Sequence, residues 1–256
     1  MEQVQTELQS RVLHIILNRP EKKNALTAAM YLALVEALER GESNKAVRAL
    51  VFRANGDSFS AGNDIEDFIQ KPWKNEAVPP AERFIRAVAN LDKPIVAAVQ
   101  GSAAGVGATI LLHCDLVYAA DDTKFLMPFV NIGLIPEAGS TLLLPELIGH
   151  RRAAELLLLA TPYSAQRAYE MGLVNHVVPV SEVVSAASSA AQALADKPAG
   201  SIRLTKRMMK QHYRSELGQV MRDEVLAIAE KLDSPECREA LAAFMQKRKP
   251  DFSKFD

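Results

Sequence analysis

The feature that most constrains the fold is the segment KPIVAAVQGSAAGVGATILLHCDLVYA, residues 93–119. It contains two apolar strand-like runs, Ile95–Val99 and Leu116–Ala119. A glycine-rich turn and an apolar helix, predicted over Ala104–His113, lie between them. Strands that alternate with helices in this way predict an α/β domain.

The same alternation occupies the first 150 residues, and helical periodicity then takes over. Further strands are predicted at Val12–Leu17, Val47–Phe52 and 173–178. Thr27 is a candidate cap for a helix. The remaining helices are predicted at Asp64–Gln70, Ala81–Leu91, Arg151–Leu159, Ala165–Met171, Val183–Leu194, Ile202–Tyr213, Leu217–Leu232 and Glu236–Lys247. The segment KPWKNEAVPP, residues 71–80, is predicted to be a mobile surface loop. We therefore expect an α/β core followed by a helical C-terminal region.

The charge balance and the cysteines exclude several classes of protein. The net charge of −1 gives no indication of a nucleic-acid or membrane surface. No apolar run approaches the roughly 20 residues of a membrane span. Cys114 and Cys237 lie far apart, which predicts neither a disulfide framework nor a zinc site. Together with an N-terminus that does not resemble a signal peptide, these features predict a cytoplasmic protein.

The first candidate site is GDSFSAGNDIEDF, residues 56–68, which follows a predicted strand. A turn made of small residues and glycine leaves backbone N–H groups uncovered, and such groups can form an oxyanion hole. The alternative is an ordinary turn from strand to helix, with Asn63 or Asp64 as the helix cap. The pattern alone leaves both interpretations open.

The second candidate is QGSAAGVGATILLHCD, residues 100–115, which contains a glycine-rich turn between a predicted strand and a predicted helix. A dinucleotide-binding fingerprint is disfavoured because Ile110 stands where its third glycine is needed, and Asp115 comes too early for its acidic residue. A phosphate-binding loop would need Gly-Lys-Ser/Thr, which is absent from the segment. The remaining prediction is a second uncovered N–H group at a helix N-terminus.

The third candidate is Glu137 in IGLIPEAGST, residues 132–141. It is the only ionisable side chain between Phe125 and Leu144. It could be solvated, it could be a charge at a helix N-terminus, or it could be a general base whose pKa is raised by desolvation. Its isolation among apolar residues favours the third interpretation.

Other motifs are disfavoured. His113, Cys114 and Asp115 are adjacent at a helix end, so they are not expected to converge on one metal ion. The sequence contains no GxSxG motif, which disfavours a nucleophilic hydrolase. The basic run RLTKRMMK, residues 203–210, is predicted to be a solvated helix face rather than a contact for phosphate groups.

Several segments in the same order carry a resemblance to a known family. They are NRPEKKNAL, FSAGNDI, residues 93–119, FLMPFVNIGLIPEAGST and AYEMGLVNHVV. From about residue 4 to 248 the chain resembles the crotonase (enoyl-CoA hydratase/isomerase) superfamily. The resemblance implies a spiral of ββα units over residues 1–195, and an α-helical trimerisation region over 196–256, with trimers or dimers of trimers. It also implies an acyl-CoA thioester as ligand, with coenzyme A as part of the substrate and no separate cofactor.

The resemblance also implies roles for individual residues. The thioester carbonyl would accept hydrogen bonds from the backbone N–H groups of Asn63 and Val106. The residues that match the coenzyme A site are Ala61, Gly62, Asp64, Ile65 and Gly105. Those that match the acyl pocket are Phe125, Phe129 and Leu134.

The reaction follows from the carboxylates that are present or missing. The two positions that carry glutamate in hydratases of the family are Thr109 and Phe129 here, which disfavours hydration of the double bond. The chain most resembles the Δ3,Δ2-enoyl-CoA isomerases of fatty-acid β-oxidation, which place one carboxylate where Glu137 stands. Ala138 departs from their glycine. The alternatives are isomerisation of a ring or epoxide CoA ester, or a non-catalytic acyl-CoA-binding protein.

Overall fold

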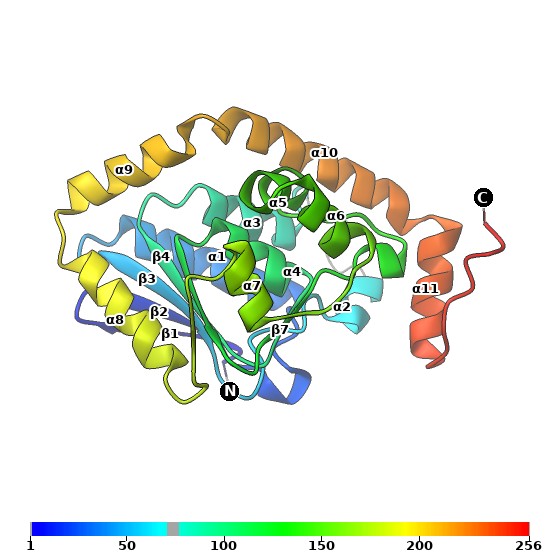
Figure 1. The fold of residues 1–256 in the computed structure, drawn as a ribbon, viewed down its shortest axis with the longest axis horizontal. Helices are drawn as coiled ribbons and strands as arrows, with labels where there is room; N and C mark the ends of the chain where they lie inside the picture. The colour runs from blue at the N-terminus through cyan, green and yellow to red at the C-terminus, as the bar shows by residue number, and fades with distance from the viewer. Residues whose placement is uncertain (1, 71–76, 256) are drawn as a thin grey trace.

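The computed structural model describes residues 2–70 and 77–255, and its largest element is a six-stranded sheet (Figure 1). In spatial order its strands are β1 (Val4–Gln9), β2 (Val12–Leu17), β3 (Ala49–Ala54), β4 (Ile95–Val99), β6 (Leu116–Ala120) and β9 (His176–Val178). β1 pairs with β2 antiparallel, and the remaining pairs are parallel. β1 was not predicted because its side chains are mostly polar and exposed. Of the predicted loop 71–80, residues 71–76 lie outside the described residues.

Most of the helices lie at the predicted segments, but the helix Ser140–Ile148 was not predicted. They are α1 (Ala28–Ser43), α2 (Ile65–Gln70), α3 (Pro80–Ala89), α4 (Val106–Thr109), α5 (Ser140–Ile148), α6 (His150–Leu158), α7 (Ala165–Met171), α8 (Val183–Ala195), α9 (Ala199–Gln211), α10 (Arg214–Leu232) and α11 (Pro235–Met245), with 3₁₀ helices η1 (Pro20–Lys22), η2 (Ile110–His113) and η3 (Val130–Ile132). Thr27 caps α1 as predicted, because its Oγ1 accepts a hydrogen bond from Met30 N at 3.2 Å.

A second, three-stranded sheet gives the chain its spiral form. It consists of β5 (Ser102–Ala104), β7 (Lys124–Leu126) and β8 (Tyr163–Ser164). After β4 the chain forms β5 and then α4, and after β6 it forms β7 and later α5. A bridge between Ser60 and Ala103 repeats the pattern after β3. The predicted α/β spiral of ββα units is confirmed.

One predicted helix is wrong in its bounds. Residues 104–113 were expected to be helical throughout, but Ala104 belongs to β5 and the α-helical part covers only α4. Gly105 has a φ of +54°, which a continuous right-handed helix cannot include. The remainder, η2, is a 3₁₀ helix.

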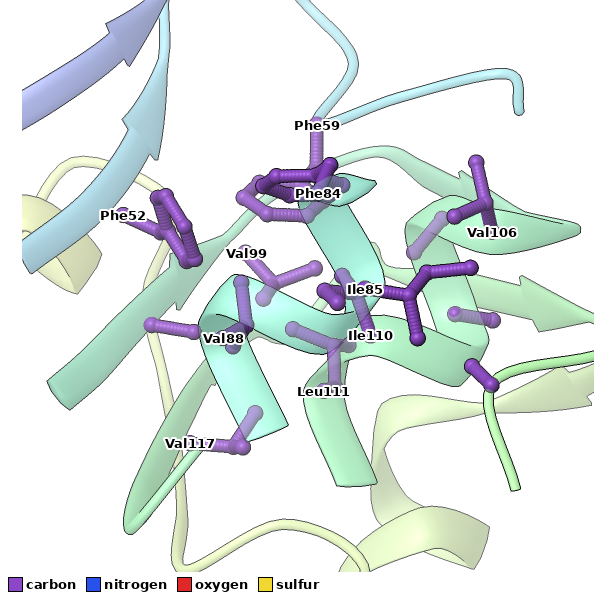
Figure 2. Close-up of a cluster of buried hydrophobic side chains, with 14 of the residues drawn as sticks. Phe52, Phe59, Phe84, Ile85, Val88, Val99, Val106, Ile110, Leu111 and Val117 are labelled. Atoms are coloured by element: carbon purple, nitrogen blue, oxygen red, sulfur yellow. The ribbon is translucent and has the colours of Figure 1, made fainter. Parts of the chain in front are cut away.

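The central strands β2, β3 and β4 are buried on both faces, and their successive side chains point to opposite sides of the sheet. Leu50 and Phe52 of β3 join the main core, whereas Ala49 and Val51 pack with α8. Figure 2 shows Phe84 and other side chains of α3 lying over residues from β3, β4 and η2. This packing fixes α3 next to the strands that lead into the two glycine turns.

The C-terminal helices α9, α10 and α11 form an arc around the spiral (Figure 1). α10 buries Leu217, Met221 and Glu224 on its inner face. Leu204, Met208 and Leu226 are exposed on α9 and α10, which suits the predicted assembly region at 196–256; oligomerisation stays a prediction. Within the described ranges, no helix has the length and apolar character needed to cross a membrane.

Candidate active site

The two glycine turns lie side by side. Ala104 N donates a hydrogen bond to Ser60 O at 2.9 Å, which holds residues 60–63 against residues 103–106. A Cβ atom at Gly62 would lie 2.9 Å from Ala104 O, so a larger residue would push the turns apart. Gly62 and Gly105 both have positive φ values, +91° and +54°. Glycine is therefore required for this approach.

The backbone N–H groups at these turns are used selectively. Those of Gly62, Asp64 and Gly105 donate to protein oxygen atoms at 2.9–3.1 Å. Across residues 2–70 and 77–255, the N–H groups of Asn63 and Val106 have no such acceptor. Val106 begins α4, where an N–H group has no partner within the helix. Two donors are thus available at neighbouring turns.

Glu137 lies shortly before α5, where its backbone oxygen accepts hydrogen bonds from Ser140 N at 3.2 Å and Ser140 Oγ at 2.6 Å. Its carboxylate Oε1 is buried and has no hydrogen-bond partner in the described part of the chain. Burial first, and the nearby charge of Glu224 second, raise the pKa of Glu137 to about 7. Of the three interpretations of Glu137, this environment fits the desolvated carboxylate.

A mainly apolar cavity of about 190 Å³ adjoins Glu137. Asn63 and Tyr31 also line it, and the Tyr31 hydroxyl donates a hydrogen bond to Asn63 Oδ1. Burial, and then the charge of Glu137, raise the pKa of Tyr31 well above its ordinary value, so Tyr31 stays protonated. The apolar wall includes Leu26, Ile85, Met221, Val225 and Ile228.

The predicted acyl-pocket residues lie elsewhere. Phe125 stacks on Tyr163 with ring centroids 5.3 Å apart, and Leu134 borders a different cavity. Phe129 is buried in the main core. Among the described residues, the cavity beside Glu137 is lined by side chains of α1, α3 and α10 instead. Sequence reasoning missed these residues, although they occupy the apolar faces of predicted helices.

The remaining predicted binding residues surround the first turn. Asp64 forms an ion pair with Arg19 at 2.7 Å and accepts a hydrogen bond from Asp67 N at 3.0 Å. Burial alone would raise the pKa of Asp64, but these two partners lower it. Ala61 is exposed, and Ile65 begins α2. The carboxylate of Asp64 therefore stabilises the turn, and a ligand would meet the backbone of this segment.

Glu224 is a further carboxylate at the cavity, which Asp64, Asp67 and Glu82 also line, and it was not predicted to be a site residue. Its Oε2 accepts a hydrogen bond from Gly139 N at 2.6 Å, and its Oε1 accepts from Thr141 N at 3.2 Å and Thr141 Oγ1 at 2.6 Å. These bonds satisfy N–H groups at the start of α5. The spacing of Leu217, Met221 and Glu224 places all three on one helix face, a signal present in the sequence.

Ala138 adopts a left-handed backbone angle that glycine tolerates best. Its φ is +63°, in the left-handed region, and its side chain is buried. Its carbonyl oxygen accepts a hydrogen bond from His113 Nε2 at 2.7 Å. Burial lowers the pKa of His113 to about 4, so the imidazole is neutral. The turn that aims Glu137 is thus held in place despite the unfavourable angle.

We expect Ala138→Gly to change the free energy of unfolding by less than about 0.5 kcal/mol. Relief of the left-handed angle, about 1–2 kcal/mol, offsets the lost methyl burial and the greater freedom of the unfolded chain. Ala187→Gly, at a buried position inside α8, has no such relief and should cost about 1–2 kcal/mol. Urea unfolding of both variants tests this. Equal losses would show that Ala138 is not strained.

The basic run 203–210 is not wholly solvated: Lys210 Nζ is buried, and the prediction is also wrong for Lys206. This side chain is buried, and its Nζ donates to Asp115 Oδ2 at 2.6 Å and to Lys93 O at 2.8 Å. It anchors α9 to the start of β4, because Asp115 also accepts from Ile95 N. His113 and Asp115 therefore have separate partners.

Known proteins match this chain over nearly its whole length. The family model described as Enoyl-CoA hydratase/isomerase matches residues 7–254. The 1,2-epoxyphenylacetyl-CoA isomerase of Escherichia coli (strain K12) is 34% identical over 99% of both chains. Enoyl-CoA delta isomerase 2 of Rattus norvegicus is 32% identical over 93% of this chain, which spans 62% of that relative. The crystal structure of an enoyl-CoA hydratase/isomerase from Pseudoalteromonas atlantica T6c has a TM-score of 0.94 and 40% identity, covering 98% of this chain and 100% of that one.

Proposed function

Because this chain belongs to the enoyl-CoA hydratase/isomerase family, we propose that it is an isomerase that converts 3-enoyl-CoA esters into 2-enoyl-CoA esters. The observation that carries the proposal is the buried Oε1 atom of Glu137, which has no hydrogen-bond partner among the described residues, while Glu137 lines a mainly apolar cavity together with Asn63. A desolvated carboxylate with a pKa near neutrality suits a group that both takes and returns a proton.

The thioester carbonyl would lie at the two glycine turns. In this proposal the N–H groups of Asn63 and Val106 donate hydrogen bonds to its oxygen. When a proton leaves C2, negative charge develops on that oxygen, and donors fixed in advance stabilise it. The loss of one such donor in other enzymes costs about 2.7–4 kcal/mol.

Glu137 would move both protons. Its carboxylate takes the proton from C2, and the electron pair of that C–H bond forms the dienolate. The resulting carboxylic acid returns the proton to C4, and the double bond shifts into conjugation with the carbonyl. One group suffices because both carbon atoms lie on one face of the allylic system. The apolar cavity excludes water, which favours return of the proton over hydration.

Hydration fits the site less well. Thr109 and Phe129 occupy the positions where hydratases of the family carry glutamates, and neither can act as a carboxylate base. Glu224 does not supply the missing group, because both of its oxygen atoms accept hydrogen bonds from the start of α5. The other carboxylates that line the cavity also have partners, because Asp64 pairs with Arg19, Glu82 pairs with Arg86, and Asp67 accepts a hydrogen bond from Ala28 N. Glu137 is therefore the carboxylate that suits isomerisation.

A second candidate is isomerisation of an epoxide CoA ester. It is favoured by the full-length similarity to the Escherichia coli 1,2-epoxyphenylacetyl-CoA isomerase. In this case Glu137 would again move a proton, but the wall formed by Ile85 and Val225 would have to receive a ring in place of a linear chain.

One set of assays tests these candidates. We expect the purified protein to convert 3-hexenoyl-CoA into the conjugated ester. The reaction is measured by the rise in ultraviolet absorbance of the conjugated thioester. Parallel reactions contain 2-hexenoyl-CoA, to detect hydration, and 1,2-epoxyphenylacetyl-CoA, to detect isomerisation of the epoxide. A protein that binds 3-hexenoyl-CoA but leaves all three esters unchanged would contradict an enzymatic function.

A further inference from the structure

A second cavity lies beside the candidate active site, and most of its polar lining side chains are cationic. It has a volume of about 180 Å³ and is formed by the end of α3, the inner face of α9 and the start of α10. Its cationic lining residues are Arg86, Lys206, Arg207, Lys210, Arg214 and Arg222. Asp92 is the one carboxylate among the described lining residues. We call this the basic cavity.

Protein groups already satisfy most of these cations. Lys206 pairs with Asp115 at 2.6 Å, and Arg207 pairs with Asp92 at 2.6 Å. Arg86 pairs with Glu82. Arg214 and Arg222 donate hydrogen bonds to the side chains of Asn90 and Gln219, respectively. These contacts hold the lining in place, and the three ion pairs leave Lys210, Arg214 and Arg222 without a carboxylate partner in the described part of the chain.

Lys210 differs from the others. Its Nζ is buried and, in the described part of the chain, has no hydrogen-bond partner. An ammonium group has three donors, and burying it without acceptors is costly. Burial, and then the neighbouring Lys206, lower the pKa of Lys210 to about 8, which still leaves most of it charged at neutral pH. The arrangement therefore lacks an acceptor at this position.

We infer that the basic cavity binds an anionic oxygen group, a carboxylate or a phosphate, with Lys210 as its central donor. Lys210, Arg214 and Arg222, which have no carboxylate partner among the described residues, provide the attraction, and the unpaired ammonium of Lys210 provides donors at hydrogen-bonding range.

The position of the cavity suggests two sources for this group. It can be a free anion from solution. It can also be the terminal carboxylate of an acyl chain, because Met221 lines both the basic cavity and the cavity beside Glu137. Leu217 lines the basic cavity and Glu224 lines the cavity beside Glu137, and these residues are about 10 Å apart along α10. An acyl chain of that length spans the two cavities when the flexible Met221 side chain moves aside. This second source rests on the proposed function.

The free anion is tested by thermal unfolding in phosphate and in chloride at equal ionic strength. Phosphate should raise the Tm of the wild-type protein by about 2–4 °C once it exceeds its Kd several-fold. Lys210→Met should abolish this gain, and it should raise the Tm in chloride because it removes an unpaired buried charge. Lys45→Met, an exposed position after α1 with the same change of charge, should keep the phosphate gain.

The acyl source is tested with 3-enoyl-CoA esters of equal length that end in a carboxylate or in a methyl group. Lys210→Met should lower the ratio of kcat/KM for the carboxylate ester to kcat/KM for the methyl ester by about tenfold or more. If Lys210→Met alters neither the phosphate gain nor this ratio, the inference is wrong. If the wild-type protein turns over neither ester, the proposed function fails, and the thermal experiment alone decides the anion site.

Discussion

Glu137→Gln is expected to lower the kcat for isomerisation by at least about 10³-fold while leaving the fold intact. General acid–base groups contribute about 10²–10⁴-fold, and Glu137 carries out both proton transfers in the proposed reaction. Glutamine has nearly the same shape but can neither take nor return the proton. Because the N–H donors of Asn63 and Val106 are unchanged, the variant should bind the ester with similar affinity. Stopped-flow absorbance and isothermal titration with a substrate analogue measure the two quantities.

Thr109→Ala is the matched comparison. Thr109 is fully buried in α4, and its hydroxyl lies 3.4 Å from Gly105 O, so it contributes to packing near the second turn. Since it holds the position of a hydratase glutamate without being an acid or a base, its loss should change kcat only a few-fold. Turnover by Glu137→Gln close to that of the wild-type protein would exclude Glu137 as the base. A large loss in Thr109→Ala would place the chemistry elsewhere.

Glu137→Gln should also change how the free energy of unfolding depends on pH. Glu137 has an ordinary pKa of 4.5, raised to about 7 in the folded protein, so the folded state binds the proton more tightly. The free energy of unfolding contributed by this group therefore falls as the pH rises from 4.5 through 7. Glu137→Gln removes this contribution. Urea unfolding at pH 5 and at pH 8 should show a smaller decrease for the variant.

Glu224→Ala is expected to lower the free energy of unfolding by about 2–4 kcal/mol. It leaves Gly139 N, Thr141 N and Thr141 Oγ1 without their acceptor, and an unsatisfied buried polar group costs about 1–3 kcal/mol. Relief from burying a carboxylate offsets part of this loss. The start of α5 should also loosen, and kcat should fall because the adjacent turn aims Glu137. Thermal unfolding and steady-state kinetics measure both effects.

Glu224→Gln removes the charge of Glu224 and keeps one of its two acceptor oxygens. The amide oxygen still accepts a hydrogen bond from α5, but the negative charge near Glu137 is gone. In the wild-type protein, kcat/KM should rise with pH to a plateau above about 7, because the free enzyme needs Glu137 deprotonated. In Glu224→Gln this limb should move to lower pH. Glu230→Gln, at an exposed position on the same helix, should leave it unchanged. An unmoved limb in Glu224→Gln would show that the charge of Glu224 does not influence Glu137.

Much of the fold could be predicted from the sequence. Long apolar runs such as β2 and β4 were located correctly to the residue, because every side chain in them is buried and the pattern is continuous. Short elements such as β5 and β8, with three and two residues, were missed, because so few residues carry no periodicity. They form because the spiral brings their backbones together.

The candidate site divides in a similar way. Glycine at positions 62 and 105, and an isolated glutamate at 137, are local features, and they indicated two tight turns and an unusual carboxylate. The side chains that line the cavity could not be identified in this way. Tyr31, Ile85 and Met221 come from three helices, and their apolar periodicity is the same as that of ordinary core residues.

The sequence by itself determined where the strands, helices and glycine turns form, because those choices depend on neighbouring residues and on the backbone angles that glycine allows. Only the tertiary structure decided how they work together. Glu224 meets Gly139 across 85 residues of chain, and the Ser60–Ala103 bridge brings the two turns side by side. Such contacts depend on the packing of whole helices and strands, and many polar side chains share the same local pattern. The desolvation of Glu137, on which its proposed role depends, is a result of that packing.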